Sequence, residues 1–146
     1  MDVVFAQIAD YANLSREGKL NILGLFDTIN AASFPTVHPQ MHLVIRFELL
    51  RHERGKSHAV EIQFEDEDGK KLFSISGQIG IQENAQVAVL PLVHSDQIIT
   101  INNLLIPREG TYQFVVLIDN NVVKGKEVKL RVVQLPKPTL PQQSGE

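Results

Sequence analysis

The sequence predicts an all-β fold: a single antiparallel β-sandwich with an immunoglobulin-like Greek key and about eight to nine strands. Three observations predict it. Apolar and polar side chains alternate with a period of two along most of the chain. β-Branched residues are abundant, with 15 Val and 13 Ile against 8 Ala. Turn signals recur about every 8–12 residues, and no stretch of about ten residues has helical periodicity.

The first part of the chain is expected to form a hairpin, a loop and a strand. Val3–Tyr11 and Lys19–Phe26 pair across the polar turn between them. Phe34–Pro39 is a long loop with two X-Pro steps. Met41–Leu49 is the clearest strand, because its odd-numbered residues are all apolar and its even-numbered residues are mostly polar.

The middle of the chain continues the same alternation. His58–Glu65 is a half-buried strand, and Asp68-Gly69 turns the chain into the next strand, Leu72–Ile81. Gly77 falls on the inner face of that strand, which predicts a bulge or a close approach of the backbone.

Two further strands are predicted at Val87–Val93 and Ile98–Ile106. The polar residues His94-Ser95-Asp96 separate them as a turn. Pro91 makes the first of the two an edge strand or a bulged strand, because proline cannot donate to a ladder.

The last elements form a hairpin. Thr111–Asp119 and Val122–Val133 are strands that pair across the turn Asn120-Asn121. In the first of them Val115 and Leu117 face outward, although the inward positions alone supply a complete apolar face.

The chain is expected to be one domain, residues 1–134, followed by a flexible Pro-rich tail, residues 135–146. The net charge of −3 is unlike that of a nucleic-acid binder. No apolar run reaches the roughly 18 residues of a membrane helix, and the start lacks the basic region of a secretory signal. We therefore expect a cytoplasmic protein with neither nucleic-acid nor membrane partners.

The segment Ile106–Phe114 resembles the corner that precedes the penultimate strand of immunoglobulin-like domains. In that corner a tyrosine near the start of the strand bonds back to nearby backbone. Here Gly110 would give the turn and Tyr112 the bond, and the alternative is a buried tyrosine that begins a strand. The chain has no Cys and no Trp, so the immunoglobulin disulfide and core tryptophan do not carry over.

Three groups of residues resemble calcium-binding, metal-binding or catalytic motifs, but their positions in the sequence do not suit those functions. The acidic run Glu65–Gly69 does not fit an EF-hand, since an apolar Phe64 would be its first ligand, and a solvated hairpin tip is favoured over a calcium site. His38 and His42 lie in a loop and a strand, where their spacing does not bring them together. His94–Asp96 are adjacent residues, which cannot form a catalytic triad. We expect no enzyme activity and no cofactor.

A partner surface is predicted where apolar residues face outward with basic residues around them. If the immunoglobulin-like order holds, Thr111–Asp119 pairs with Met41–Leu49 and with Val122–Val133. The alternative is that the extra apolar residues pack under the loop Phe34–Pro39 or the tail. The predicted surface comprises His42, Val44, Arg46, Val115, Leu117, Lys129 and Arg131.

Nearly the whole chain before the tail resembles a family of small, functionally uncharacterised bacterial proteins, a domain of unknown function. The resemblance implies a single-domain β-sandwich and transfers no catalytic residue. It is carried by Ile8–Asn13, Gly18–Asp27, Phe34-Pro35 with His38-Pro39, Leu43–Glu48, Pro107–Phe114 and Arg131–Val133.

Three hypotheses for function follow. The first is a non-catalytic binding module whose partner is another protein or a second copy of the chain. The second is a sandwich that binds a small ligand or carbohydrate, although the chain has no Trp and Tyr11 is its one Tyr outside the corner. The third, ranked last, is a metal-dependent enzyme built on His38, His42 and an acidic loop residue.

Overall fold

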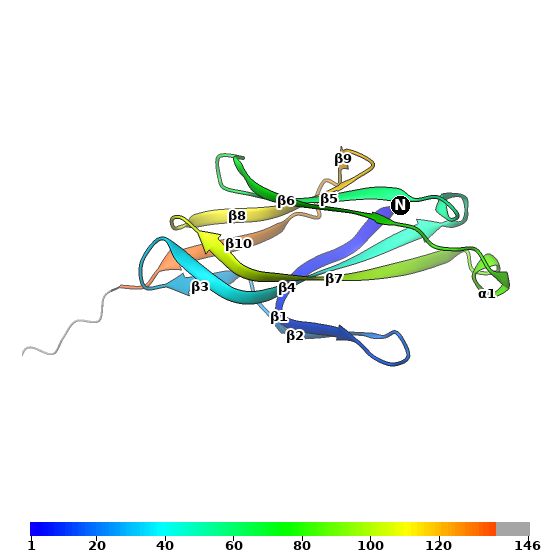
Figure 1. The fold of residues 1–146 in the computed structure, drawn as a ribbon, viewed down its shortest axis with the longest axis horizontal. Coiled ribbons are helices and arrows are strands. Elements are labelled where there is room, and N and C mark those ends of the chain that lie inside the picture. The colour runs from blue at the N-terminus through cyan, green and yellow to red at the C-terminus, as the bar shows by residue number, and fades with distance from the viewer. Residues whose placement is uncertain (137–146) are drawn as a thin grey trace, which may run out of the picture.

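The computed structural model describes residues 1–136, so positions 137–146 of the predicted tail lie outside the described residues. The described chain folds into two β-sheets that pack face to face (Figure 1), which confirms the predicted all-β sandwich. Its strands are β1 (Asp2–Leu14), β2 (Leu20–Leu25), β3 (Thr28–Ala31), β4 (Thr36–Leu50), β5 (His58–Glu65), β6 (Lys71–Ile79), β7 (Leu92–Ile106), β8 (Gly110–Ile118), β9 (Asn121–Val122) and β10 (Val128–Gln134).

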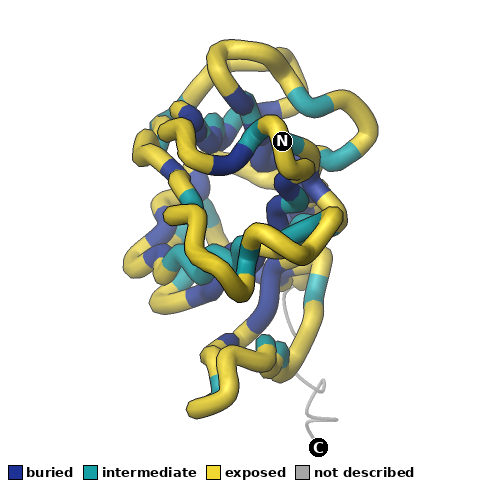
Figure 2. The backbone as a smooth tube through the Cα atoms, turned by 90° about the vertical axis from the view of Figure 1, so that its right-hand side faces the viewer, coloured by how far each residue is buried: buried dark blue, intermediate teal, exposed yellow. Residues whose placement is uncertain are grey.

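A four-stranded sheet has the order β2-β1-β4-β7, and a six-stranded sheet has the order β3-β10-β8-β5-β6, with β9 paired to β8. All pairings are antiparallel except that of β3 with β10, which is parallel. Buried positions alternate with more exposed ones along β5 and β10, as expected where one face of a sheet packs against the core, and Figure 2 shows bands of buried and exposed residues along the chain.

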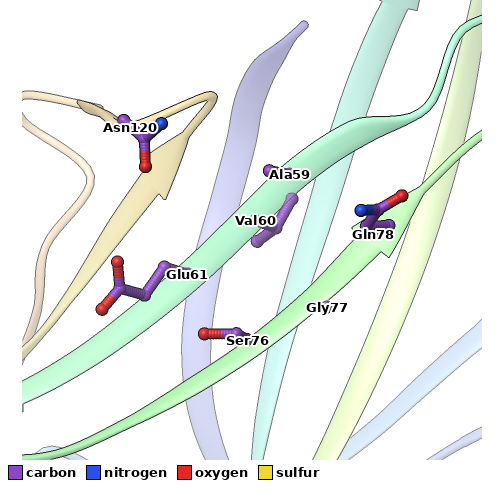
Figure 3. Close-up of a pocket in the computed structure, with 7 residues that line it drawn as sticks. All are labelled: Ala59, Val60, Glu61, Ser76, Gly77, Gln78 and Asn120. Carbon is purple, nitrogen blue, oxygen red and sulfur yellow. The ribbon is translucent and has the colours of Figure 1, made fainter.

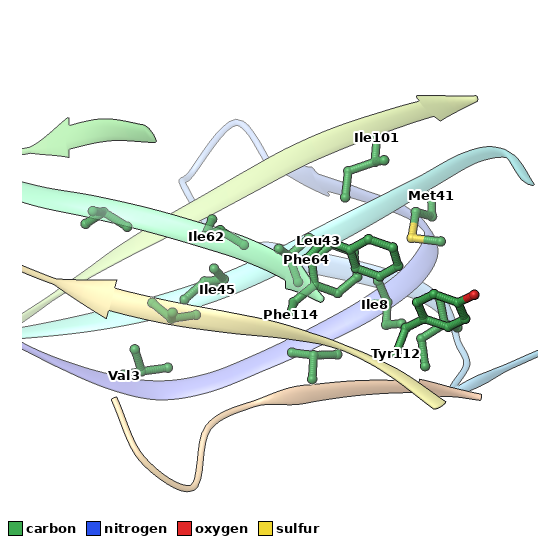
Figure 4. Packing of buried hydrophobic residues seen from close by; sticks show 14 of the residues in the cluster. Val3, Ile8, Met41, Leu43, Ile45, Ile62, Phe64, Ile101, Tyr112 and Phe114 are labelled. Atoms are coloured by element: carbon green, nitrogen blue, oxygen red, sulfur yellow. The ribbon is translucent and has the colours of Figure 1, made fainter. Parts of the chain in front are cut away.

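The core is built from the inward residues of both sheets (Figure 4). Four aromatic rings form one group within it. The Phe64 ring stacks on that of Tyr112 with centroids 5.4 Å apart, and it lies 4.7 Å from the ring of Phe114 and 5.1 Å from that of Phe73. Such aromatic pairs add about 0.5–1.5 kcal/mol each to the free energy gained from burial alone.

This aromatic group decides which strand lies beside β8. Phe64 of β5 pairs directly with Phe114 of β8, and β10 flanks β8 on its other side. The predicted pairing of Thr111–Asp119 with Met41–Leu49 is therefore wrong, because β4 is a central strand of the opposite sheet, between β1 and β7. The immunoglobulin-like Greek key stays a prediction.

The start of β8 is held by the hydroxyl of Tyr112, which donates a hydrogen bond of 2.6 Å to the carbonyl oxygen of Arg108. This backward bond defines a tyrosine corner. Gly110 lies between the two residues at φ +150°, a conformation that L residues rarely adopt, and a Cβ there would collide with the Glu67 carboxylate.

The acidic turn between β5 and β6 fastens this corner to the neighbouring hairpin. The buried Asp66 accepts from the backbone N–H groups of Asp68 and Lys70, at 3.0 and 2.9 Å. Its second oxygen accepts from the Arg108 guanidinium at 3.1 Å. Glu67 accepts from the backbone N–H of Thr111 at 2.6 Å. These carboxylates thus already bind donors within the fold.

The predicted strand Val87–Val93 and the turn after it are wrong. A short helix, α1 (Ala85–Ala88), replaces the strand, since the Asn84 side chain caps it by accepting from two backbone N–H groups. Arg54 donates to the carbonyl oxygens of Val87 and Leu90, which ties this segment to the turn that follows β4. His94–Asp96 lie inside β7, in a continuous ladder with β4.

Three smaller predictions also differ from the structure. The predicted strand Val122–Val133 is divided between β9 and β10, with Gly125 at positive φ between them. The predicted loop Phe34–Pro39 already contains the start of β4, while the sequence pattern missed β3. Gly77 pairs regularly with Val60, and a Cβ on it would meet no atom within 4 Å, so neither a bulge nor a close approach occurs there.

Replacing Tyr112 by Phe is expected to lower the free energy of unfolding by about 1 kcal/mol, because the ring still packs but the bond to the Arg108 carbonyl is lost. Urea denaturation followed by circular dichroism measures the change. Tyr11→Phe is the matched control: Tyr11 is 48% exposed, and we expect a change within about 0.5 kcal/mol. An equal loss in both variants would contradict the role given to the corner.

Candidate functional site

The outer face of the four-stranded sheet carries exposed apolar side chains on the β1–β2 hairpin. Ala9 pairs with both Leu25 and His42, and Tyr11 pairs with Leu23, so all five residues lie on one face. Tyr11, Leu23 and Leu25 are 48%, 62% and 58% exposed. We call these three residues the hairpin patch. Figure 1 shows the hairpin at the lower side of the sandwich.

The buried His42 lies next to this patch and fixes the hairpin to β4. The β1–β4 ladder ends at the pair Ala9 and His42, so Asp10 has no backbone pairing partner on β4. His42 Nδ1 lies 3.1 Å from the carbonyl oxygen of Asp10 and donates to it in the tautomer that carries hydrogen on Nδ1. The Tyr11 ring meets the His42 ring edge to face, with centroids 5.4 Å apart.

Farther along the same face, Arg46 and Asp96 form a two-point ion pair between β4 and β7. Arg46 Nε and Nη2 donate to the two carboxylate oxygens of Asp96 at 2.7 and 2.9 Å. These bonds raise the pKa of Arg46 above its ordinary value. The guanidinium also lies 5.6 Å from the centre of the Phe5 ring, within cation–π range. The positive charge of Arg46 is thus paired with Asp96 and Phe5 of the same sheet.

The structure divides the predicted partner surface between the two sheets. His42, Val44 and Arg46 lie on β4, whereas Val115 and Leu117 lie on β8 and Lys129 and Arg131 on β10. The seven residues therefore do not form one continuous surface.

Two of the apolar residues placed at its centre are also buried, since Val44 is 0% exposed and Val115 is 6% exposed. The hairpin patch lies outside the predicted surface. The signal for it is that Leu20–Leu25 carries apolar residues on both faces, which a half-buried strand does not need.

A polar hollow of about 330 Å³ lies over β5, β6 and the turn before β9 (Figure 3). Gln78, on its rim, accepts a hydrogen bond of 2.6 Å from Ser57. The one carboxylate in the lining belongs to Glu61. Its cross-strand neighbour Ser76 carries the one hydroxyl group of the lining, and no His, Lys or Arg side chain lines the hollow. The arrangement can bind polar groups but offers no acid–base pair. Its lining consists of Ala59, Val60, Glu61, Ser76, Gly77, Gln78 and Asn120.

A second cluster of titratable groups lies at the start of β5. His58 Nδ1 is 3.0 Å from an Asp119 carboxylate oxygen, and Nε2 is 2.7 Å from the carbonyl oxygen of Glu53. Both partners are acceptors, so each ring nitrogen that carries hydrogen can donate to the acceptor beside it. Hydrogen bonds from His58 and from the backbone N–H of Ala59 hold the pKa of Asp119 below its ordinary value. The cluster ties β5 to the turn after β8.

Within residues 1–136, no three His, Cys, Asp or Glu side chains gather closely enough to hold a metal ion. His38 packs against the Phe26 ring, with centroids 5.7 Å apart, while His42 packs against Tyr11. The two histidines of the metal hypothesis therefore have different neighbours. In the same part of the chain no helix has both the length and the apolar character needed to span a membrane.

Residues 4–133 match a family of unknown function, DUF6941. Because the match covers well over half of the 146 residues, the chain belongs to that family. The resemblance to a functionally uncharacterised family is thereby confirmed. No curated protein matches the chain.

Asp119→Asn is expected to flatten the loss of stability on acidification. Because the pKa of Asp119 is lowered in the folded state, its ionised carboxylate stabilises the fold above the unfolded-state pKa. That contribution is lost as the pH falls through the folded-state pKa, so the difference between wild type and variant should begin to shrink below about pH 4 and should vanish below the lowered folded-state pKa. Thermal melts across the acid range measure the difference.

The control for this measurement is Asp68→Asn, which changes an exposed carboxylate in the β5–β6 turn, far along β5 from His58. Because Asp68→Asn leaves the His58–Asp119 contact in place, its melting temperature should keep the part of the wild-type pH dependence that this contact causes. If the melting temperatures of wild type and Asp119→Asn differed by the same amount at every pH, the stabilising role of the His58–Asp119 contact would be contradicted.

Proposed function

We propose that this member of the family DUF6941 is a non-catalytic protein-binding module that docks through its β1–β2 hairpin. The observation that carries the proposal is the hairpin patch: Tyr11, Leu23 and Leu25 stand about half or more exposed, side by side on one face. Single exposed apolar residues are ordinary on protein surfaces, whereas clustered ones are typical of contact sites.

The surroundings of the patch fit an apolar protein surface as its partner. Asn13 and Asn21, which pair across the hairpin beyond Tyr11, bond to each other through their side chains at 3.0 Å and give an uncharged polar border. Arg46 is held by Asp96 and is not free to attract an acidic ligand. Burial of apolar area around an aromatic anchor is therefore the expected source of affinity.

The absence of catalysis is proposed from how the polar side chains are used. Asp66 binds backbone N–H groups and Arg108, Asp96 binds Arg46, and Asp119 binds His58. Each of these carboxylates already has donors that belong to the fold. A general acid or base must instead face space that a substrate can enter.

A second candidate function is the binding of a small polar ligand or carbohydrate in the hollow beside β5 and β6. Its volume of about 330 Å³ and its polar side chains, Glu61, Ser76, Gln78 and Asn120, favour this function. No aromatic ring lines the hollow to stack on a sugar, which is why we rank it second.

Replacing both Leu23 and Leu25 by Ser is expected to reduce recovery of the bound partner at least about tenfold, the effect of losing roughly 1.4 kcal/mol of contact. Folding should be retained, because surface substitutions usually change stability by about 0.5 kcal/mol or less. The measurement is quantitative co-precipitation with the tagged chain expressed in its own host, followed by titration of the purified partner.

Val122→Ser is the matched control, since Val122 is 49% exposed and lies on β9 in the other sheet. It should leave recovery unchanged. Equal loss in both variants, or no loss in the double variant, would contradict docking through the hairpin. Loss of glycan or small-ligand binding on Gln78→Ala, with the hairpin variant unaffected, would support the second candidate instead.

A further inference from the structure

We infer that β7 pairs edge to edge with β7 of a second copy of the chain, so that the two four-stranded sheets become one continuous sheet across a two-fold axis. This inference concerns the edge opposite β2 and does not depend on the function proposed for the hairpin. Three observations support it. Within residues 1–136, β7 is a long strand with a free outer edge, part of it pairs with β4 without interruption, and an apolar cavity opens beside it.

The terminal strands of the two strand orders formed by the described residues, β2 and β7 in one sheet and β3 and β6 in the other, differ in how their outer edges are protected. β2 and β3 are short edges of 6 and 4 residues. β6 has 9 residues and begins with Lys71. β7 has 15 residues, is paired on one side only, and contains no Pro, Lys or Arg. Natural proteins blunt edges with short strands, lysines and prolines, so the outer edge of β7 is suited to accept another strand.

The regular part of β7 fixes the register of that pairing. It pairs with β4 without interruption from Leu92, opposite Leu50, to Asn102, opposite Gln40. Asn103 follows at φ 54° and ends the regular stretch. A two-fold axis gives the longest overlap when it passes through the midpoint, Gln97.

In this register, residues at equal distances from Gln97 face each other across the axis. Val93 then meets Ile101 of the second copy, and Ser95 meets Ile99, all on the inner face. Antiparallel pairs of this kind keep inner side chains with inner side chains, as a continuous sheet requires.

Charge also permits this pairing. His94 and Asp96 are the ionisable residues between Leu92 and Asn102. The register places Asp96 opposite Ile98 of the second copy and His94 opposite Thr100, so no like charges meet. Asp96 keeps its own counter-charge, Arg46, from the adjacent strand β4.

An apolar opening between β6 and β7 supplies surface for the second copy to cover. The cavity has a volume of about 160 Å³, and Phe47, Ile75, Ile79 and Ile99 contribute to its walls. Gly77 lies at this opening without a side chain, and a Cβ there would meet no atom within 4 Å. A strand added to β7 would cover Ile99 and narrow the mouth of the cavity, which is the apolar burial that stabilises association.

Single-cysteine cross-linking tests the register, because the chain contains no Cys. Directly opposed Cα atoms in antiparallel strands lie about 4.5–5.5 Å apart, within the range of about 4.4–6.8 Å that a disulfide spans. Gln97→Cys is therefore expected to form a covalent dimer with itself under mild oxidation. His94→Cys alone should not, since its own counterpart would lie six positions away, at about 20 Å.

An equimolar mixture of His94→Cys and Thr100→Cys should cross-link, because those positions face each other in the proposed register. Thr100→Cys alone should not, for the same reason as His94→Cys. Cross-linking of His94→Cys with itself that matches or exceeds that of Gln97→Cys would overturn the register. Absence of cross-linking in all samples would overturn the pairing.

Light scattering after size exclusion tests the dimer without cysteine. The wild type should be a dimer, Gln97→Lys and Gln97→Glu should each be monomeric, and their mixture should regain the dimer, because opposite charges then meet at the axis. Equal melting behaviour of the two variants and the wild type shows that folding is retained. Ser76→Lys, which adds a lysine to the β6 edge, is the control and should remain dimeric.

The hairpin variant Leu23→Ser/Leu25→Ser should also remain dimeric, which separates this inference from the function proposed above. A wild type that stays monomeric at roughly 1 mM, where a dimer with a Kd of that value would be half formed, would overturn the inference. A dimer that Gln97→Lys leaves intact would overturn it as well.

Discussion

The burial of β4 on both of its faces constrains most of this structure. From Met41 to Ile45 every residue is buried, whichever sheet face it occupies. A polar side chain buried in such a strand costs free energy unless it finds a hydrogen-bond partner. His42 and the nearby, half-buried Arg46 meet this requirement in different ways, and each partner fixes a neighbouring element.

His42 is satisfied by the carbonyl oxygen of Asp10, at the point where β1 leaves β4. That bond anchors the base of the β1–β2 hairpin and sets its apolar residues on the outer face. Arg46 is satisfied by both oxygens of Asp96. This ion pair requires Asp96 to lie beside β4, and it accounts for a continuous β7 where the local sequence favours a turn.

The hairpin patch and the proposed pairing edge of β7 belong to the same sheet. The hairpin lies at its β2 edge and the unpaired side of β7 at its other edge. The outer face of the six-stranded sheet is instead crossed by bonds between its own side chains, such as Gln113 with Glu65 at 2.5 Å and Gln63 with Glu61 at 3.1 Å. Both proposed contact elements therefore lie on the four-stranded sheet, whereas several outer side chains of the six-stranded sheet bond to one another.

The sequence by itself determined the sandwich, most of its strands and the segment that forms the tyrosine corner. Those features follow from local signals: the period-two alternation of β5, the Asp-Gly turn after it, and a tyrosine two residues after Gly110. Only the tertiary structure decided which strands are neighbours, because Phe64 and Phe114 meet across a long sequence separation.

Tertiary structure also decided the fate of His94–Asp96, of Val87–Val93 and of the predicted surface. Asp96 is held in a strand by Arg46, and the short helix α1 is held by Asn84 and Arg54. Val115 and Val44 face outward, as their alternation predicts, yet they are buried and lie on opposite sheets. Alternation tells which face of a strand a residue occupies, but not which strand lies next to it, and exposure depends on both.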